Sequence, residues 1–271
     1  MKADKLRTAI IYIIIILLGL ICLLPLLNII AISFSSSAAV EGNMVGLIPV
    51  GFSTAAYEKI LEDSQFWHSF LISVERVVLA LIINFVLIVL MAYPLSKTNA
   101  QFRGRNIYAN LMIFAMLFNG GMIPTFLVVK SYGLLNTVWA LVLPGAVPIF
   151  NVILVMNFFA AVPKELEEAA FIDGANPLQV LTKIFIPISK PVLATVSLFS
   201  IVGSWNDFYS GLIYMSKATY YPLMTYIQSL QINVEDLIKQ GNLSAVVDSA
   251  APGNTNLNAA KIVVAVIPLL L

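Results

Sequence analysis

The chain has 271 residues, of which 60% are hydrophobic and only 11% are charged, whereas ordinary soluble domains carry about 25% charged residues. This composition excludes an ordinary soluble protein and predicts an integral membrane protein. The formal net charge of +1 gives no electrostatic reason to expect a nucleic-acid partner, so the positions of the charges are more informative than their sum.

The first predicted span runs from about Ile10 to Ile32 and follows three cationic residues. A cleavable signal peptide is the alternative, but its apolar core is typically about 7–15 residues long, so we interpret this segment as an uncleaved span. Cys22 lies within it, and a lone cysteine there is expected to be an inert small hydrophobe. Residues 34–68 mix polar residues, glycines and short apolar pieces. Together with the first span, they predict that residues 1–69 form an N-terminal transmembrane helix and an extracytoplasmic loop.

Five further apolar segments predict an all-α protein with six transmembrane helices, because helices satisfy their own backbone groups in lipid. These segments are about Ser69 to Leu95, Ile107 to Val129, Val138 to Ala161, Val192 to Tyr214, and Ala259 to Leu271. The last is short: 14 residues from Asn258 to Leu271 extend about 21 Å at about 1.5 Å per residue. A hydrocarbon core is about 30 Å thick, so this helix is expected to be incomplete in the chain.

The positive charges predict the orientation of the spans. One side would hold the N-terminus, the 96–106 loop and the 162–190 loop, with nine of the fifteen Lys and Arg residues: Lys2, Lys5, Arg7, Lys97, Arg103, Arg105, Lys164, Lys183 and Lys190. The other six are Lys59, Arg76, Lys130, Lys217, Lys239 and Lys261. By the positive-inside rule the first side is cytoplasmic, which makes the protein multi-pass with a cytoplasmic N-terminus.

The long polar segment on the predicted cytoplasmic side carries signals for two short helices. Pro163 is suited to a first helical position, and the glutamates that follow are favoured by the helix dipole. Gly174 can end this helix in a left-handed conformation, and Asn176-Pro177 can start the next one with an N-cap and a first-turn proline. Pro187 and Pro191 are expected to interrupt the chain again before the fifth span.

On a helical wheel the first of these helices has an apolar face with Leu166, Ala169 and Ala170, while Glu168 lies roughly opposite. The small alanines would let another protein surface approach closely. Glu167 lies about 100° from Glu168 and is expected to be the less sensitive position.

This segment resembles the EAA loop of ABC importer permeases. The triplet Glu168-Ala169-Ala170 is followed by Gly174 after six positions and by Pro187 after nineteen, as in that family, with Ile186 where leucine is usual. The resemblance implies a cytoplasmic coupling-helix loop that docks on an ATPase. The implied ATPase-coupling residues are Glu168, Ala169, Ala170, Asp173, Gly174 and Pro187. The alternative is a solvated amphipathic loop between two spans.

The resemblance extends over about residues 70–271, which we take as the permease core domain. The stretches 118–124, 133–140 and 204–208 look like those of carbohydrate permeases of the maltose-type subfamily, in the oligosaccharide branch. The resemblance implies the type I importer fold, transport by alternating access, and a location in a bacterial cytoplasmic membrane. It also implies a related permease subunit, two ATPase subunits that bind ATP and Mg, and an extracellular or periplasmic sugar-binding protein.

The chain carries no recognisable catalytic or metal site. A Gly-x-x-x-x-Gly-Lys-Ser/Thr phosphate loop is absent from the sequence, so the chain is not expected to be the ATPase itself or any other enzyme. One histidine, His68, and one cysteine make a zinc site improbable. No cofactor is expected on this chain.

Polar and aromatic residues in the spans are candidates for the solute path: Asn119, Asn151, Trp205, Asn206, Asp207 and Tyr209. Aromatic rings can stack on the apolar face of a sugar, and amide or carboxylate groups can bind its hydroxyls. The alternative is a set of interfacial aromatics with helix–helix hydrogen bonds.

Two other functions are alternatives to an oligosaccharide permease. An ABC permease for a peptide, an amino acid or phosphate would favour fixed countercharges in the path, and the spans show few. A secondary transporter would be expected to show paired intramembrane carboxylates or internal repeats, and neither is recognisable in the sequence.

Overall fold

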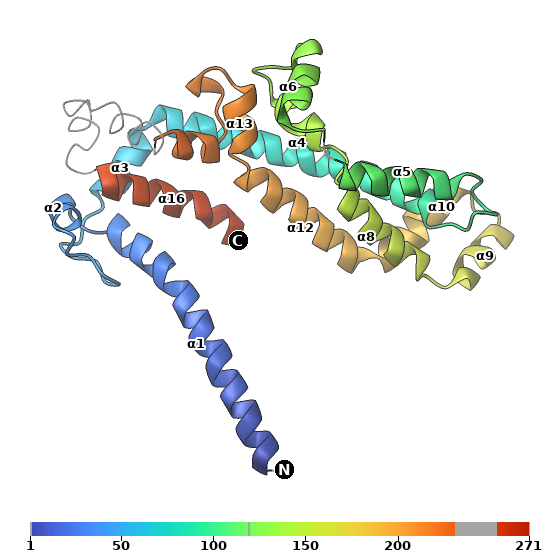
Figure 1. The fold of residues 1–271 in the computed structure, drawn as a ribbon, viewed down its shortest axis with the longest axis horizontal. Coiled ribbons are helices and arrows are strands. Elements are labelled where there is room, and N and C mark those ends of the chain that lie inside the picture. The colour runs from blue at the N-terminus through green and yellow to red at the C-terminus, as the bar shows by residue number, and fades with distance from the viewer. Residues whose placement is uncertain (1, 119, 231–253, 271) are drawn as a thin grey trace. The chain divides into compact units, whose positions relative to one another are not determined.

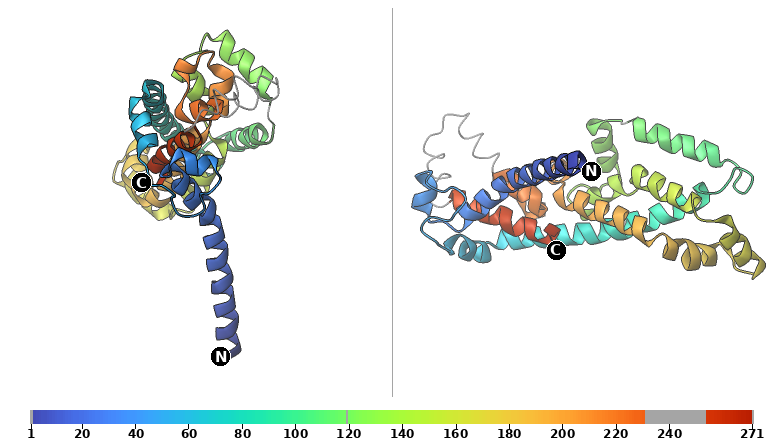
Figure 2. Two further views of the ribbon diagram at one scale, coloured as in Figure 1. Left: turned by 90° about the vertical axis from the view of Figure 1, so that its left-hand side faces the viewer. Right: turned by 90° about the horizontal axis from the view of Figure 1, so that it is seen from below.

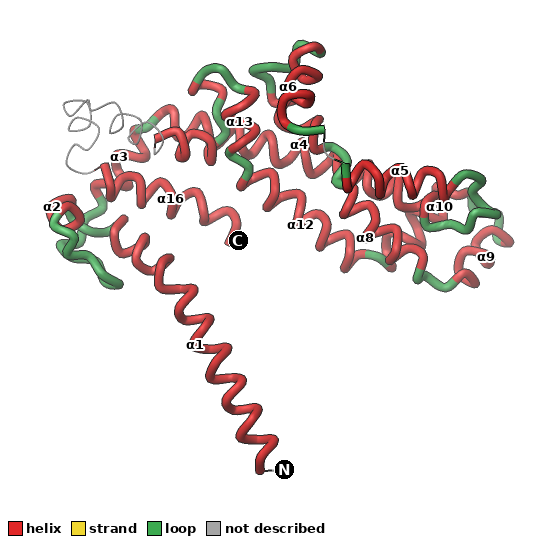
Figure 3. The backbone as a smooth tube through the Cα atoms, in the orientation of Figure 1, coloured by secondary structure: helices red, strands yellow, loops and turns green. Residues whose placement is uncertain are grey.

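A computed structural model describes residues 2–118, 120–230 and 254–270. Within these ranges the regular structure is helical, with no strand (Figure 3). The chain divides into two compact units, Met1–His68 with Tyr226–Leu271, and Ser69–Thr225. The domain division at residue 69 that the sequence suggests stays a prediction.

The first unit is built from the two ends of the chain (Figure 1). Its apolar C-terminal helix packs against the three N-terminal helices. The elements are α1 (Lys2–Ser33), α2 (Ser37–Glu41), α3 (Ala55–Glu62) and α16 (Asn254–Leu270). Helix α16 begins at Asn254, whereas the sequence predicted a start at Ala259. Its first turn packs against the other helices of this unit, so the residues of that turn do not have to be apolar.

A buried hydrogen-bonded group connects α16 to the start of α4 (Ser64–Leu95). The Lys261 ammonium donates to the Asp63 carboxylate at 2.6 Å and to the Tyr226 hydroxyl at 3.1 Å, and that hydroxyl donates to Asp63 at 2.9 Å. Burial alone would raise the pKa of Asp63, but hydrogen bonds from Lys261, Phe66 and Tyr226 outweigh it and the pKa lies below its usual value. The ionised carboxylate thus compensates a lysine inside an otherwise apolar helix, which would be costly unpaired.

The second unit contains most of α4 and the helices up to α13. The α8 and α12 helices pack together and lie side by side in the views of Figures 1 and 2. A core of apolar side chains from α4, α8, the segment 180–185 and α12 fills the space between them, including Ala92, Val155, Phe159, Phe185 and Val196. The elements are α5 (Arg105–Leu117), α6 (Met122–Ser131), α7 (Val138–Val142), η1 (Leu143–Gly145), α8 (Ile149–Ala160), α9 (Lys164–Ile172), α10 (Pro177–Val180), η2 (Leu181–Phe185), α11 (Ile186–Ile188), α12 (Lys190–Asn206), α13 (Tyr209–Tyr214) and η3 (Ala218–Tyr220).

Two helices in the described residues are long and apolar enough by themselves to cross a membrane, Ile10–Ser33 and Ser64–Leu95. The second begins five residues before the predicted Ser69, because Asp63 accepts the Phe66 N–H at 3.0 Å and caps the extra turn. Up to five spans are present if each bent helix pair is one span.

The helix axis bends sharply within each of the three pairs. The axis turns by 112° between α5 and α6, where Gly121 has φ +88°, and by 47° between η1 and α8, next to Pro148. It turns by 84° between α11 and α12, at Ser189. The predicted fifth span is likewise interrupted, since α12 ends at Asn206 and α13 begins at Tyr209.

Candidate functional site

The segment from Pro163 to Ser189 folds as a helix, a tight turn and a second helical run. Helix α9 ends in two hydrogen bonds, from the Ala175 N–H to the Ala170 carbonyl at 2.9 Å and from the Gly174 N–H to the Phe171 carbonyl at 3.1 Å. Gly174 has φ +81°. This is the Schellman geometry that a glycine favours, so the predicted left-handed helix end is confirmed.

The second helix begins with a complete capping box. The Asn176 side chain accepts the Gln179 N–H at 2.8 Å, and the Gln179 side chain accepts the Asn176 N–H at 2.9 Å. Pro177 occupies the first helical position, as predicted. Pro163, in contrast, is the N-cap of α9 with φ −55° and ψ 130°, one residue before the position that we predicted for it. Because the ψ angle of Pro163 lies outside the helical range, the first residue with helical backbone is Lys164.

The residues matching the EAA pattern lie on the surface of this unit. Ala170 is half-buried, whereas the other five are exposed: Glu168, Ala169, Asp173, Gly174 and Pro187. An open cavity of about 480 Å³ lies in the bend of the loop and is lined by Ala170, Asp173, Gly174, Gln179 and Lys183 among others. The loop therefore presents a notched, partly polar surface with small side chains.

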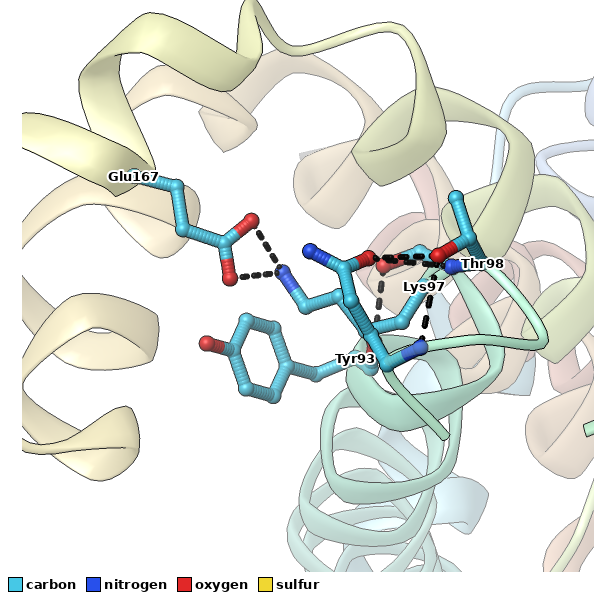
Figure 4. Close-up of polar contacts among 6 residues, drawn as sticks. Tyr93, Lys97, Thr98 and Glu167 are labelled. Atoms are coloured by element: carbon cyan, nitrogen blue, oxygen red, sulfur yellow. Dashed lines mark hydrogen bonds and ion pairs between the residues drawn. The ribbon is translucent and has the colours of Figure 1, made fainter. Parts of the chain in front are cut away.

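Helix α9 does not bury the apolar face that its sequence suggests. Leu166 is 44% exposed, while Glu167 is only 8% exposed. The Lys97 ammonium, in the loop after α4, lies 2.7 Å from both carboxylate oxygens of Glu167 (Figure 4). The ion pair with Lys97, 70 residues away in sequence, thus favours burial of the Glu167 side of α9, and Leu166 is exposed.

Lys97 itself is enclosed on its other sides by aromatic rings. Its Nζ lies 4.1 Å from the centre of the Tyr93 ring and 4.2 Å from that of Phe185, within the range of a cation–π interaction. Burial lowers the pKa of the Lys97 ammonium below its usual value, although the Glu167 carboxylate opposes this shift. Sequence reasoning missed this pair, because Lys97 was counted only as one of the cytoplasmic cations.

The candidates for the solute path do not share one environment. Asn119 lies outside the described residues. Asn151 is buried in α8. Trp205 is buried against the Phe70 ring, with ring centres 5.8 Å apart. Asn206 and Tyr209 are exposed, and the Tyr209 hydroxyl donates to the Met122 sulfur at 3.0 Å.

Asp207 forms an ion pair with Arg76, one of the six cations on the predicted non-cytoplasmic side. Arg76, in α4, is 4% exposed; its guanidinium forms an ion pair with the Asp207 carboxylate and donates to the Asp207 carbonyl at 2.8 Å. The same carboxylate accepts the Ser210 N–H at 3.1 Å, in the first turn of α13. An arginine in one predicted span and an aspartate in another are a possible signal for this pair, because either charge is costly unpaired, although Glu75 lies next to Arg76 in the sequence.

A polar cavity of about 200 Å³ lies beside this pair, where two helices are interrupted. It is lined by Arg76 and Asp207, by Asn84 and Ser210, and by Pro144 of η1, among others. Asp207 thus lies between α12 and α13, accepts a hydrogen bond from the first turn of α13, and lines the small polar cavity.

Comparison with known proteins places these features in a family. Residues 74–271 match the family described as binding-protein-dependent transport system inner membrane component. Protein LplC of Bacillus subtilis (strain 168) is 40% identical over 252 residues, which cover 93% of this chain and 84% of LplC.

A second relative from the same organism is the polygalacturonan/rhamnogalacturonan transport system permease protein YtcP, which is 40% identical over 268 residues, 99% of this chain and 92% of YtcP. Among solved structures, a chain of a bacterial ABC transporter involved in the import of the acidic polysaccharide alginate superposes with a TM-score of 0.87. The sequences are 31% identical, and the match covers 100% of this chain and 95% of the other.

Proposed function

We propose, from the premise that this chain belongs to the family of binding-protein-dependent transport system inner membrane components, that it is the permease subunit of an ATP-driven oligosaccharide importer. The observation that carries this proposal is the 40% identity with YtcP along nearly the whole chain. The relatives support a saccharide as the solute and not the peptide, amino acid or phosphate that we considered as alternatives.

The transport mechanism would be alternating access through six spans. The two continuous helices, the bent pairs of the second unit and α16 are the segments available for such spans. With the N-terminus and the loop after α4 in the cytoplasm, the Glu168-Ala169-Ala170 loop lies on the same side, where an ATPase can reach it. We therefore assign this loop as the coupling element in a bacterial cytoplasmic membrane.

The partners follow from this assignment. Two ATPase subunits would bind ATP and Mg, and one of them would dock on the notched surface of the loop. This chain itself would bind neither ATP nor Mg. A related permease subunit would complete the membrane path, and an extracellular or periplasmic binding protein would deliver the oligosaccharide. The exposed Glu168 and Ala169 support this docking, because a charged residue next to a small one permits both an ion pair and close approach.

A reconstituted complex is expected to show solute-dependent ATP hydrolysis. This chain, its sister permease and the ATPase would be placed in lipid nanodiscs and mixed with a binding protein loaded with neutral or acidic oligosaccharides. Hydrolysis should rise severalfold with a saccharide-loaded binding protein. Stimulation by a peptide-loaded or phosphate-loaded binding protein, with none by any saccharide, would favour the alternative solutes.

Gly174→Val is expected to weaken ATPase docking by roughly tenfold. An added Cβ would meet no atom within 4 Å, so the cost arises from the backbone at φ +81°. A left-handed conformation costs an L-residue about 1–2 kcal/mol, and about 1.4 kcal/mol is tenfold in affinity. Gly174→Asn is the matched control, because asparagine tolerates this conformation. Equal co-purification of the ATPase with both variants would show that this turn does not position the docking surface.

A further inference from the structure

Three elements of the second unit meet at the Lys97 ammonium. Tyr93 belongs to the last turns of α4, Glu167 to α9 and Phe185 to η2. Lys97 and Glu167 are both largely buried, with side chains 12% and 11% exposed. The Tyr93 and Phe185 rings also pack edge-to-face, with centres 5.1 Å apart. Two aromatic rings thus support the charged pair, and Figure 4 shows that of Tyr93 beside it.

Lys97 lies two residues beyond the end of α4, so its ion pair with Glu167 joins α9 to that end of α4. Among the residues that the structure describes, Lys97–Glu167 is the one ion pair that α9 makes with another part of the chain. The rest of α9 packs mainly on α10, which follows it directly in the loop. Ala170 of α9 also packs against the core to which α4 contributes, so the ion pair is the charged part of the contact through which a displacement of α9 can reach α4.

Adjacent glutamates of α9 face in different directions. Glu168 is exposed, whereas Glu167 is buried against Lys97. Consecutive residues of a helix are separated by about 100°, so one short helix can contact a docked subunit on one side and α4 on the other. A buried ion pair is suited to transmit a displacement, because separating two largely desolvated charges is costly.

We propose that Lys97 and Glu167 form a transmission link that makes α9 and the adjoining end of α4 move together during transport. Both are positioning residues: they contact neither solute nor nucleotide, and they convert movement of the docked ATPase into movement of a long spanning helix. This inference rests on the proposed function, because it requires a docked ATPase and a transported solute.

The test separates coupling from assembly. Lys97→Met keeps most of the aliphatic side chain and removes the charge, and Glu167→Gln keeps the shape of the carboxylate without its charge. In the reconstituted complex, each is expected to lower the amount of sugar transported per ATP hydrolysed at least fivefold. Recovery of the ATPase by co-purification should stay within twofold of the parent complex.

Three further variants serve as controls. Lys97→Arg keeps a cation that can lie over the aromatic rings, so it should retain at least half of the parent's sugar transported per ATP. Lys164→Met and Glu165→Gln make the same charge changes at exposed positions of α9 and should behave like the parent.

Several results would overturn the link. One is an unchanged ratio of sugar to ATP in both Lys97→Met and Glu167→Gln. Another is a fall in ATPase recovery as large as the fall in sugar transport. That result would mean that the pair only stabilises the loop. An equal loss in Lys97→Arg or in the exposed controls would also contradict it. Failure of the parent complex to transport any saccharide would instead defeat the proposed function, whatever the variants do.

Discussion

Glu168→Ala is expected to weaken binding of the ATPase subunits more than a hundredfold while membrane insertion stays intact. The carboxylate is exposed and makes no hydrogen bond or ion pair with any residue that the structure describes, so its removal costs this chain little. A solvated ion pair is worth about 0–1 kcal/mol. Removing one partner of a desolvated pair costs about 3–5 kcal/mol, and each 1.4 kcal/mol is about tenfold in affinity.

The measurements must separate insertion, docking and transport. Protease accessibility reports insertion, co-purification reports ATPase binding, and uptake of labelled sugar by cells reports transport. Glu165→Ala makes the same charge change at another exposed position of α9 and should alter binding less than threefold. If Glu168→Ala and Gly174→Val both assemble and transport like the parent, the loop is not the coupling element.

The structure changes what is expected of Glu167. From the sequence alone it was the less sensitive neighbour of Glu168, yet it is buried and paired with Lys97. Glu167→Ala should therefore impair transport without abolishing ATPase binding, which is a different defect from that of Glu168→Ala.

Asp207→Asn is expected to lower the thermal stability of the detergent-solubilised complex by roughly 10 °C. Arg76 is 4% exposed and would keep its charge without a countercharge. Removing one partner of a buried pair costs about 3–5 kcal/mol, and 1 kcal/mol shifts the midpoint by about 2–4 °C in domains of 150–250 residues. The fraction of complex that survives heating would be measured by size-exclusion chromatography.

A double variant distinguishes a structural pair from a solute contact. Arg76→Met with Asp207→Leu removes both charges, and such replacements of buried pairs are often neutral or stabilising, so stability should return towards that of the parent. Asn206→Ala, at the exposed neighbouring position, should change stability little. Loss of sugar transport in Asp207→Asn at unchanged stability would instead assign Asp207 to the solute path.

The turn between α9 and α10 was largely predictable because its geometry is set within a few residues. Gly174 ends α9, and Asn176 starts α10, through hydrogen bonds that span three to five positions; Pro177 follows at the first helical position. These caps satisfy backbone groups that any helix end leaves unpaired, so the residue types themselves indicate the turn. The same holds for the breaks near Gly121 and Pro148, although the size of each bend does not follow from the sequence.

By itself, the sequence determined that this protein is a helical membrane protein, where its apolar segments lie, and how the loop turns at Gly174, since all of these depend on composition and local backbone chemistry. The tertiary structure alone decided that α9 buries Glu167 and exposes Leu166, that Arg76 braces Asp207, and that Lys261 is held by Asp63. Those three pairs join residues that are 70, 131 and 198 positions apart. The physical reason is that a buried charge is tolerated only where a countercharge offsets the loss of hydration, and no helical periodicity encodes a partner so distant along the chain.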